Sequence, residues 1–297
     1  ARVMRKGVPG TIGMAASFVS NTPNDIPALL SIVTDGEVPY DLPLRKMVTT
    51  QVDDVPTLFG KPRPVFHVDR PDIIQSLGQF IDFADPDDLE DMPKAVTEYV
   101  PVEMSPEQYK FYQNQIQKMP KSWVKRVMRG QWFGGPKNRA IAARQAAQST
   151  YGKYGDSDKT IDTSTKVQKM VRDLDLHLKE KPRNKVVIYS NFVDAGVRPI
   201  HMALAREGIP HSVFIGHGNE VDDEAVNETS RNRAVSDFKA GKTRVIIVSG
   251  AGAKGLNLKS GTMFMAAEGH FNPEVIRQAQ ARIRRLGAHK DVPKEDR

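Results

Sequence analysis

Residues 243–267 read TRVIIVSGAGAKGLNLKSGTMFMAA, two apolar runs joined by a glycine-rich connection. Neither run alternates between polar and apolar residues, which is typical of strands covered on both faces of a sheet. Gly250, Gly252 and Gly255 have the spacing of a dinucleotide-binding fingerprint. Only LNLKSG separates Gly255 from the second run, whereas a helical crossover needs about ten or more residues. A dinucleotide enzyme, which needs a helix after Gly255, is therefore disfavoured.

Similar runs alternate with helical patterns on both sides of this stretch. The expected strands are 185–190, 211–216, 243–249 and 262–267. The expected helices are 164–178 with Ser164 as its cap, 199–207 before Gly208, 231–240 before Gly241, and 273–286 before Gly287. Strands without polar alternation, separated by helices, predict an α/β fold with a parallel sheet that is covered on both faces.

Three parts are expected along the chain. Residues 1–60 resemble the end of another α/β unit, with a strand at 17–20 and a helix at 26–33. Connections rich in Pro and Asp at 60–71 and 83–93 follow. The expected parts are 1–60, the end of a first α/β lobe; 61–160, a linker with a mainly helical basic insertion; and 161–297, the second lobe.

The net charge of +7 is unevenly distributed. Residues 111–160 hold 10 Lys and Arg against 2 Asp and Glu, and aromatic residues such as Trp123 and Trp132 lie between the cations. Basic charge interleaved with aromatic rings favours a phosphate backbone and its bases, so Lys125 and Arg126 are candidate nucleic-acid-binding residues. The alternative is a solvated basic helical hairpin with its two tryptophans in a small core.

Several classes of site have no support in the sequence. The chain has no cysteine, which excludes disulfide frameworks and cysteine-zinc sites. The histidines show no paired spacing typical of a metal site, so no metal ligand is predicted in this chain, and no nucleophile elbow is present. No apolar run approaches a membrane span and no signal peptide is visible, so we expect no membrane partner and an intracellular location, in host cytoplasm or virion.

Two short motifs imitate nucleotide-binding signatures. The stretch AGKT at 240–243 resembles the end of a phosphate loop, but the first glycine of that motif would fall on Ser236, and the stretch enters a strand instead of leaving one. The stretch DEAV at 223–226 resembles a magnesium-binding acidic box, but no buried strand precedes it, so a polar loop is expected there.

The expected helix at 273–286 carries four arginines whose positions divide into faces. An apolar stripe consists of Ile276, Ala279, Ile283 and Leu286. A second stripe beside it holds Gln278, Arg282 and Arg285. The remaining two arginines, Arg277 and Arg284, lie on a third face. The helix is therefore expected to pack through its apolar stripe and to present an amide and two guanidinium groups together.

An ordered set of motifs remains: SNTPND, VEMSPEQYKFY, TSTKVQKMVRDL, KVVIYSNF, RVIIVSGAGAKGLNL, EGHFNP and RQAQARIRRLG. In this order they resemble the C-terminal part of superfamily-2 helicases of the Swi/Snf-like group, and most closely the viral and phage branch that includes the poxvirus nucleoside triphosphatase. The resemblance covers nearly the whole chain. It implies RecA-like lobes and an ATP-driven DNA translocase or helicase.

The resemblance also assigns roles to residues of this chain. It makes Arg282 and Arg285 the arginine fingers that face the nucleotide of the other lobe, where they stabilise charge on the γ-phosphate. The implied ATP-binding residues are Gln278, Gly255 and Asn257. The implied nucleic-acid contacts are Ser190, Asn191, Ser249 and Lys254, and the implied coupling motif holds Thr22 and Pro23. The other two arginines, Arg277 and Arg284, are left as solvated or as secondary DNA contacts.

The phosphate loop and Asp-Glu box of that family are absent from the sequence. In the family both precede the Thr-Pro motif, so we expect them upstream of Ala1, and with them most of the contacts to ATP and Mg²⁺. The chain is accordingly expected to be a fragment without ATPase activity of its own. The alternative is a nucleic-acid or protein docking module that has lost catalysis, in which the basic segment matters and the arginine pair does not.

Overall fold

The computed structural model describes residues 49–55, 63–68, 95–122, 137–216, 218–221, 224–250, 256, 258, 261–270, 273–284, 288–289 and 292. The chain divides into two compact units, Ala1–Leu89 and Glu90–Arg297. None of the helices in these described stretches is long and apolar enough to cross a membrane.

In the first unit, the described residues form one antiparallel hairpin. Strand β1 (Thr49–Val55) pairs with β2 (Arg63–Val68), with a register shift between Gln51 and Asp53. The irregular connection expected at 60–71 is therefore wrong for Arg63–Val68, which form β2. The strand tolerates Pro64 because, in a two-stranded ladder, one edge of each strand is unpaired and needs no N–H donor. The strand expected at 17–20 and the helix expected at 26–33 lie outside the described residues.

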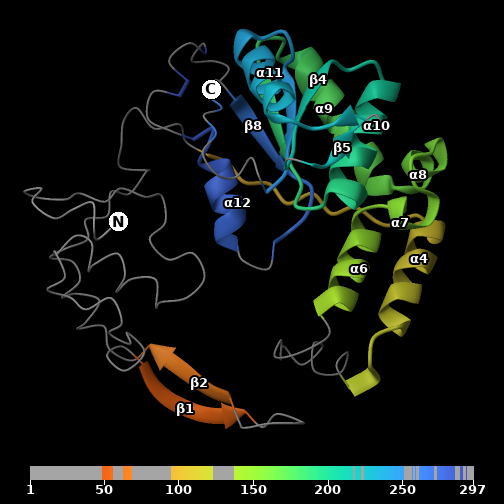
Figure 1. Ribbon diagram of the computed structural model, residues 1–297, viewed down its shortest axis with the longest axis vertical. Coiled ribbons are helices and arrows are strands. Elements are labelled where there is room, and N and C mark those ends of the chain that lie inside the picture. Colours follow the sequence, from red (N-terminus) through yellow and green to blue (C-terminus); the bar gives the residue numbers. More distant parts are fainter. Residues whose placement is uncertain are drawn as a thin grey trace, which may run out of the picture. The chain divides into compact units, whose positions relative to one another are not determined.

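A four-stranded parallel sheet forms the centre of the second unit (Figure 1). Its order is β4 (His211–Phe214), β7 (Val245–Val248), β3 (Lys185–Tyr189) and β8 (Gly261–Ala266). Along β3, Val186 and Ile188 belong to one core cluster, whereas Val187 and Tyr189 belong to another. All four are buried, which explains the absence of polar alternation and confirms the predicted parallel sheet.

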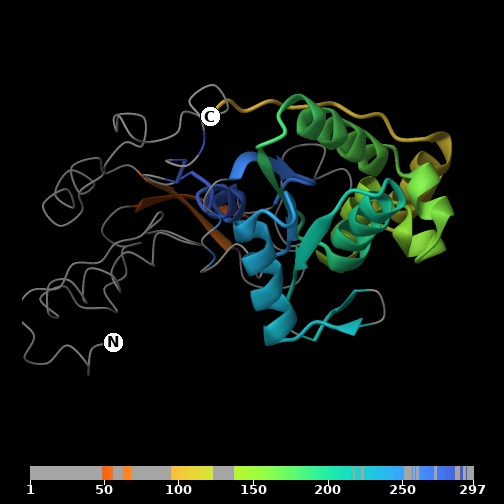
Figure 2. The same ribbon diagram turned by 90° about the horizontal axis from the view of Figure 1, so that it is seen from above.

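Helices cover both faces of this sheet (Figures 1 and 2). On one face, α9 (Thr165–Glu180) and α10 (Arg198–Arg206) contribute residues such as Leu174 and Leu204. On the other face, α11 (Glu228–Ala240) contributes Phe238 and α12 (Pro273–Gln280) contributes Ala279. The result is the α/β fold that the sequence predicts.

A helical subregion precedes the sheet in the same compact unit. It consists of α4 (Pro106–Gln117), α6 (Lys137–Gln148), α7 (Tyr151–Tyr154) and α8 (Asp158–Thr163). Gln108 of α4 is fully buried, and its Nε2 donates to the carbonyl oxygens of Ala146 and Ala147, each at 3.1 Å. These carbonyls end α6, so the amide satisfies groups that the helix itself leaves unpaired.

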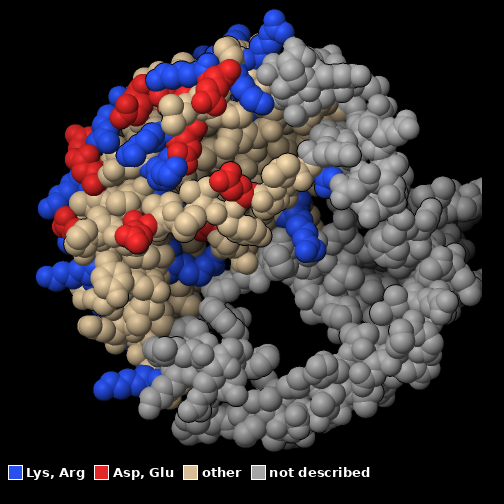
Figure 3. Space-filling view, turned by 180° about the vertical axis from the view of Figure 1, so that it is seen from behind, with Lys and Arg blue, Asp and Glu red and all other residues tan. Residues whose placement is uncertain are grey.

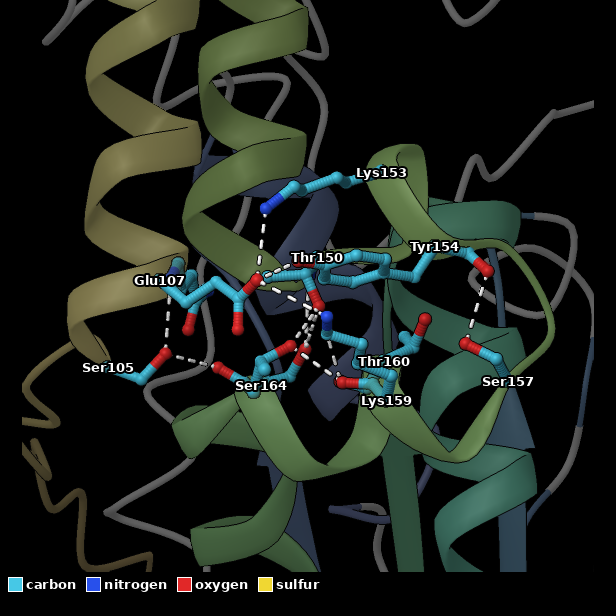
Figure 4. A network of polar contacts seen from close by, with 11 residues as sticks. Ser105, Glu107, Thr150, Lys153, Tyr154, Ser157, Lys159, Thr160 and Ser164 are labelled. Carbon is cyan, nitrogen blue, oxygen red and sulfur yellow. Dashed lines mark hydrogen bonds and ion pairs between the residues drawn. The ribbon is translucent and has the colours of Figure 1, made fainter.

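Polar contacts join α4 to α7 and α8 (Figure 4). The Glu107 carboxylate accepts from Lys153 Nζ at 3.0 Å and from the Tyr154 hydroxyl, and it lies 3.8 Å from Lys159 Nζ. Ser164 stands at the N-cap of α9 as predicted, but its hydroxyl accepts from the backbone N–H of Thr150 at 3.0 Å instead of bonding to α9. The expected cap therefore serves the neighbouring turn.

Two local expectations differ from the structure, and one helical turn is an addition to the predicted elements. Helix α11 begins at Glu228 instead of 231, because Asn227 and Ser230 form a reciprocal capping box. The stretch 223–226 is no polar loop, since β5 (Glu220–Val221) and β6 (Glu224–Ala225) pair as a short hairpin there. A π-helical turn, η2 (Val193–Val197), precedes α10.

Helix α12 ends at Gln280, earlier than the expected end at 286. Beyond it the bonds tighten, because the N–H of Arg282 reaches the Ala279 carbonyl and that of Ile283 reaches Gln280, both at 3.1 Å. This bend brings Ile283 onto the start of β8, where a Cβ built on Gly261 would lie 2.8 Å from Ile283 Cγ2. The expected remainder, residues 285–287, lies outside the described residues.

Candidate functional site

The loops that follow β3, β7 and β8 meet at the carboxyl edge of the sheet. Asn191 follows β3 and is half-buried, and a Cβ built on Gly250 after β7 would lie 3.9 Å from Asn191 Oδ1. Buried Ser249 donates its backbone N–H to the Phe214 carbonyl at 3.1 Å. The structure therefore brings together Asn191 and the Ser249–Gly250 turn, where the sequence expected a ligand to bind.

Ser190 has a different environment from Asn191. Its side chain is fully buried, and its Oγ lies 3.1 and 3.0 Å from the two carboxylate oxygens of Glu268. The backbone N–H of Asn191 donates to the same carboxylate. A Cβ on Gly196 would lie 1.9 Å from Ser190 Oγ, so only glycine leaves room for this hydroxyl. Ser190 can thus contact a bound strand only if this loop rearranges.

The turn at 267–269 after β8 is held from three directions. The Ala267 carbonyl accepts from Lys166 Nζ of α9 at 3.2 Å. The Glu268 carboxylate accepts from the loop after β3. The Gly269 carbonyl accepts from the guanidinium of Arg144 on α6, which also lies over the Phe192 ring at 5.2 Å. Each of three consecutive residues is therefore fixed by a different element.

Burial controls the titration of this cluster. It raises the pKa of the Glu268 carboxyl above its ordinary value, although the bonds from Asn191 and Ser190 and the charge of Lys166 oppose the rise. Burial likewise lowers the pKa of the Lys166 ammonium, against the attraction of Glu268. The pKa of Tyr189 rises to about 12, because its hydroxyl is desolvated and Glu268 is nearby. The cluster is a desolvated polar site and not a solvated salt bridge.

The arginine segment is packed against β8 through the predicted apolar stripe. Ala279 and Ile283 are buried and Ile276 packs beside them, which confirms these three positions, whereas Leu286 lies outside the described residues. Gln278 and Arg282 are half-buried, and Arg277 is exposed. Beyond the segment, His289 Nε2 bonds to the Gly261 carbonyl at 2.7 Å. The side chains of Gln278 and Arg282 supply an amide and a guanidinium, the donor chemistry that a nucleotide phosphate needs.

Three described cations of the basic segment have printed contacts within the protein, at Arg144, Lys153 and Lys159. Lys153 and Lys159 face Glu107, and Arg144 contacts the turn at 269. Figure 3 shows lysine and arginine side chains interspersed with carboxylates over the upper part of the visible described face. The nucleic-acid-binding role predicted for Lys125 and Arg126 stays a prediction, because both residues lie outside the described residues.

Other candidate residues also fall outside the described parts of the chain. They are Arg285, Lys254, Gly255, Asn257, Thr22 and Pro23, whose roles remain predictions. Between Gly255 and β8, the described residues Leu256 and Leu258 are not helical. The strand begins at Gly261, so the spacing argument against a dinucleotide-binding helix stands.

Sequence reasoning missed several participants. No motif in the sequence marks Glu268 or Arg144 as a partner of the loop after β3. Their contacts join residues 77 to 125 positions apart, which local patterns do not reveal. His201 and His211 are only ten positions apart, and their Nδ1 and Nε2 atoms lie 2.7 Å from each other. Within the described residues, no three His, Cys, Asp or Glu side chains gather as a metal site.

Comparisons with known proteins agree with this architecture. The model of the helicase conserved C-terminal domain matches residues 166–287. A putative ATP-dependent RNA helicase of Acanthamoeba polyphaga mimivirus is 28% identical over 139 residues, which are 47% of this chain and 28% of that protein. A probable global transactivator of Orgyia pseudotsugata multicapsid polyhedrosis virus is 33% identical over 112 residues, 37% of this chain and 21% of that protein.

Two solved structures are also similar. The C-terminal part of the Fun30 ATPase domain has a TM-score of 0.49 at 18% identity and covers 66% of this chain and 82% of its own. A Sulfolobus solfataricus SWI2/SNF2 ATPase core in complex with dsDNA has a TM-score of 0.45 at 20% identity, covering 62% and 36%. Residues 166–287 therefore match the helicase conserved C-terminal domain, and the viral relatives support the resemblance of the motifs to the Swi/Snf-like group of superfamily-2 helicases.

Proposed function

We propose that this chain supplies the second lobe of an ATP-dependent DNA translocase or helicase. The observation that carries the proposal is the helicase C-terminal domain at 166–287, whose motif residues Asn191 and Ser249 follow adjacent parallel strands at one sheet edge. That edge would touch the backbone of a DNA strand, with Lys254, Lys125 and Arg126 as further contacts. The site of action would be inside the cell in which the protein is made.

Within this proposal, Arg282 and Arg285 neutralise charge at the γ-phosphate of ATP held chiefly by the first lobe. Gln278, Gly255 and Asn257 are the proposed ATP contacts of this lobe, and Thr22 and Pro23 couple the lobes. When bound, ATP with Mg²⁺ supplies the phosphoryl group and the metal that neutralises its charge. The Arg282 side chain is half-buried, and the next residue, Ile283, packs against Gly261 at the start of β8. This packing restrains the backbone at Arg282 and supports a role for its side chain as a positioned donor.

The test is ATP hydrolysis by a chain extended upstream to include the expected phosphate loop, measured with and without DNA. Arg282→Ala and Arg285→Ala should each reduce DNA-stimulated turnover by about a thousandfold, because the transition-state charge loses a guanidinium. Arg172→Ala, on the exposed side of α9, is the matched control and should stay within about twofold of the parent.

If neither arginine substitution changes ATP hydrolysis and both variants still bind DNA, the docking-module alternative is supported. In that case substitution of Lys125 and Arg126 should weaken DNA binding and flatten its salt dependence, whereas the arginine pair should have no effect.

A further inference from the structure

The loop between β3 and η2 carries Asn191, the proposed nucleic-acid contact that is best placed at the sheet edge. Asn191 and Phe192 belong to no strand or helix, so no ladder of backbone bonds fixes them. Two side-chain groups hold the loop: the Ser190 hydroxyl, which accepts from the Phe192 N–H at 3.3 Å, and the carboxylate of Glu268. The two oxygens of Glu268 accept from the Ser190 hydroxyl at 3.1 and 3.0 Å and from the Asn191 N–H.

The neighbouring groups leave this loop little room to rearrange. Gly196 closes on the Ser190 hydroxyl from one side, since a Cβ there would lie 1.9 Å away. On the other side, the Arg144 guanidinium lies 5.2 Å from the centre of the Phe192 ring. Glu268 itself cannot withdraw freely, because the residues on both sides of it are bonded to Lys166 and Arg144.

A carboxylate suits this position better than a neutral side chain. It is acceptor-only and can take both donors at once, whereas the amide of glutamine has one acceptor oxygen and would point two donor hydrogens at the loop. The Lys166 ammonium, which bonds to Ala267 and to Gln148 Oε1 at 3.0 Å, supplies a compensating charge next to it. The arrangement holds a half-buried anion of the turn after β8 against the loop after β3.

We propose that Glu268 is a positioning residue for nucleic-acid binding: its carboxylate fixes the Ser190–Phe192 loop and thereby holds the Asn191 side chain beside the end of β7. This inference rests on the proposed function, because it assigns the binding role to Asn191. It also changes the role of Ser190, whose buried hydroxyl positions the loop and does not itself contact the strand.

The experiment is a double-mutant cycle on this chain, read by the fluorescence anisotropy of a labelled DNA duplex. Asn191→Ala and Glu268→Ala should each weaken binding by about tenfold, the usual loss when a charge-assisted bond is removed. The double variant should bind no more weakly than either single variant, because Glu268 acts through Asn191. Glu268→Gln should fall between the parent and Glu268→Ala, since the amide retains one of the two bonds.

Glu180→Gln, at the exposed end of α9, is the matched control for loss of one carboxylate and should leave binding unchanged. If Glu268→Ala does not fold, as judged by thermal melting, Ser190→Ala replaces it in the cycle with the same expectation of non-additivity.

Additive losses in the cycle would mean that Glu268 only supports the fold and would overturn the inference. The inference would also be overturned if Glu268→Ala bound DNA as tightly as the parent or more tightly. Tighter binding would mean that the carboxylate only repels the phosphates of the DNA. A parent chain that binds no DNA would instead remove the proposed function, and this inference with it.

Discussion

Two glutamates organise two regions of this unit in opposite ways. Glu107, in the helical subregion, is partly exposed, with 37% of its side chain accessible, and the bond from Lys153 followed by the charges of Lys153 and Lys159 lowers its pKa. Glu268, at the sheet edge, is bonded to neutral donors of the loop after β3, and burial raises its pKa. The first joins helices by attraction between solvated charges, whereas the second orients a loop at a cost in desolvation.

This difference indicates where the molecule tolerates change. A solvated ion pair is screened by salt and replaced easily by water, so the contact at Glu107 is expected to matter little. A buried carboxylate with specific donors has no such substitute, because its partners would be left unsatisfied. Three substitutions test this contrast.

The largest effect is expected from Gly196→Ala, which adds a Cβ 1.9 Å from Ser190 Oγ at the sheet edge. Forcing atoms apart in a packed site should lower the free energy of unfolding by about 3 kcal/mol. The measurement is urea denaturation. Gly152→Ala in α7 is the control, because its Cβ would meet only Phe111 at 3.4 Å, an ordinary contact. Equal effects of the two substitutions would show that the sheet edge is no more constrained than the helical subregion.

An intermediate effect is expected in the pH dependence of Glu268→Gln. The raised pKa of Glu268 means that its contribution to stability is fully present below the ordinary value of 4.5 and is lost as pH rises through the higher folded value. Glutamine does not titrate, so the variant should lose less stability than the parent as pH rises above the ordinary value of 4.5. Denaturant unfolding at a series of pH values measures this slope, and parallel curves for parent and variant would contradict the assignment.

The smallest effect is expected from Glu107→Gln, and it has the opposite sign. The lowered pKa of Glu107 gives stability that is present above 4.5 and is lost as pH falls through the folded value. The variant should therefore differ from the parent slightly at neutral pH and not at all at strongly acidic pH. Melting temperatures at low and high salt measure the difference, which should shrink with added salt. A large, salt-independent loss would place Glu107 in the same class as Glu268.

Sequence patterns predicted the architecture well because the core strands are apolar on both faces and short glycine-ended helices separate them. They located β3, β4, β7 and β8, and the buried positions Ala279 and Ile283. They failed where distant contacts decide. The bend after Gln280 depends on Ile283 meeting Gly261, and the π-helical turn at η2 accompanies the burial of Ser190 against Gly196.

The candidate site was predictable only in part for the same reason. Asn191 and Ser249 were expected from motifs at strand ends, and they do lie near each other at the sheet edge. Glu268 and Arg144 are distant in sequence from the loop that they hold, so no local pattern connects them.

The segment that contains Arg282 is supported at both ends of one strand. The turn at 267–269 is bonded where β8 ends, and Ile283 and His289 return to Gly261 where β8 begins. The chain is therefore bonded to the sheet before this helix and packed on it after the helix, so the helix is restrained at both of its ends. The backbone at Arg282 is thus ordered when the chain folds, and under the proposed function this ordering entropy would not be lost again when the nucleotide site forms.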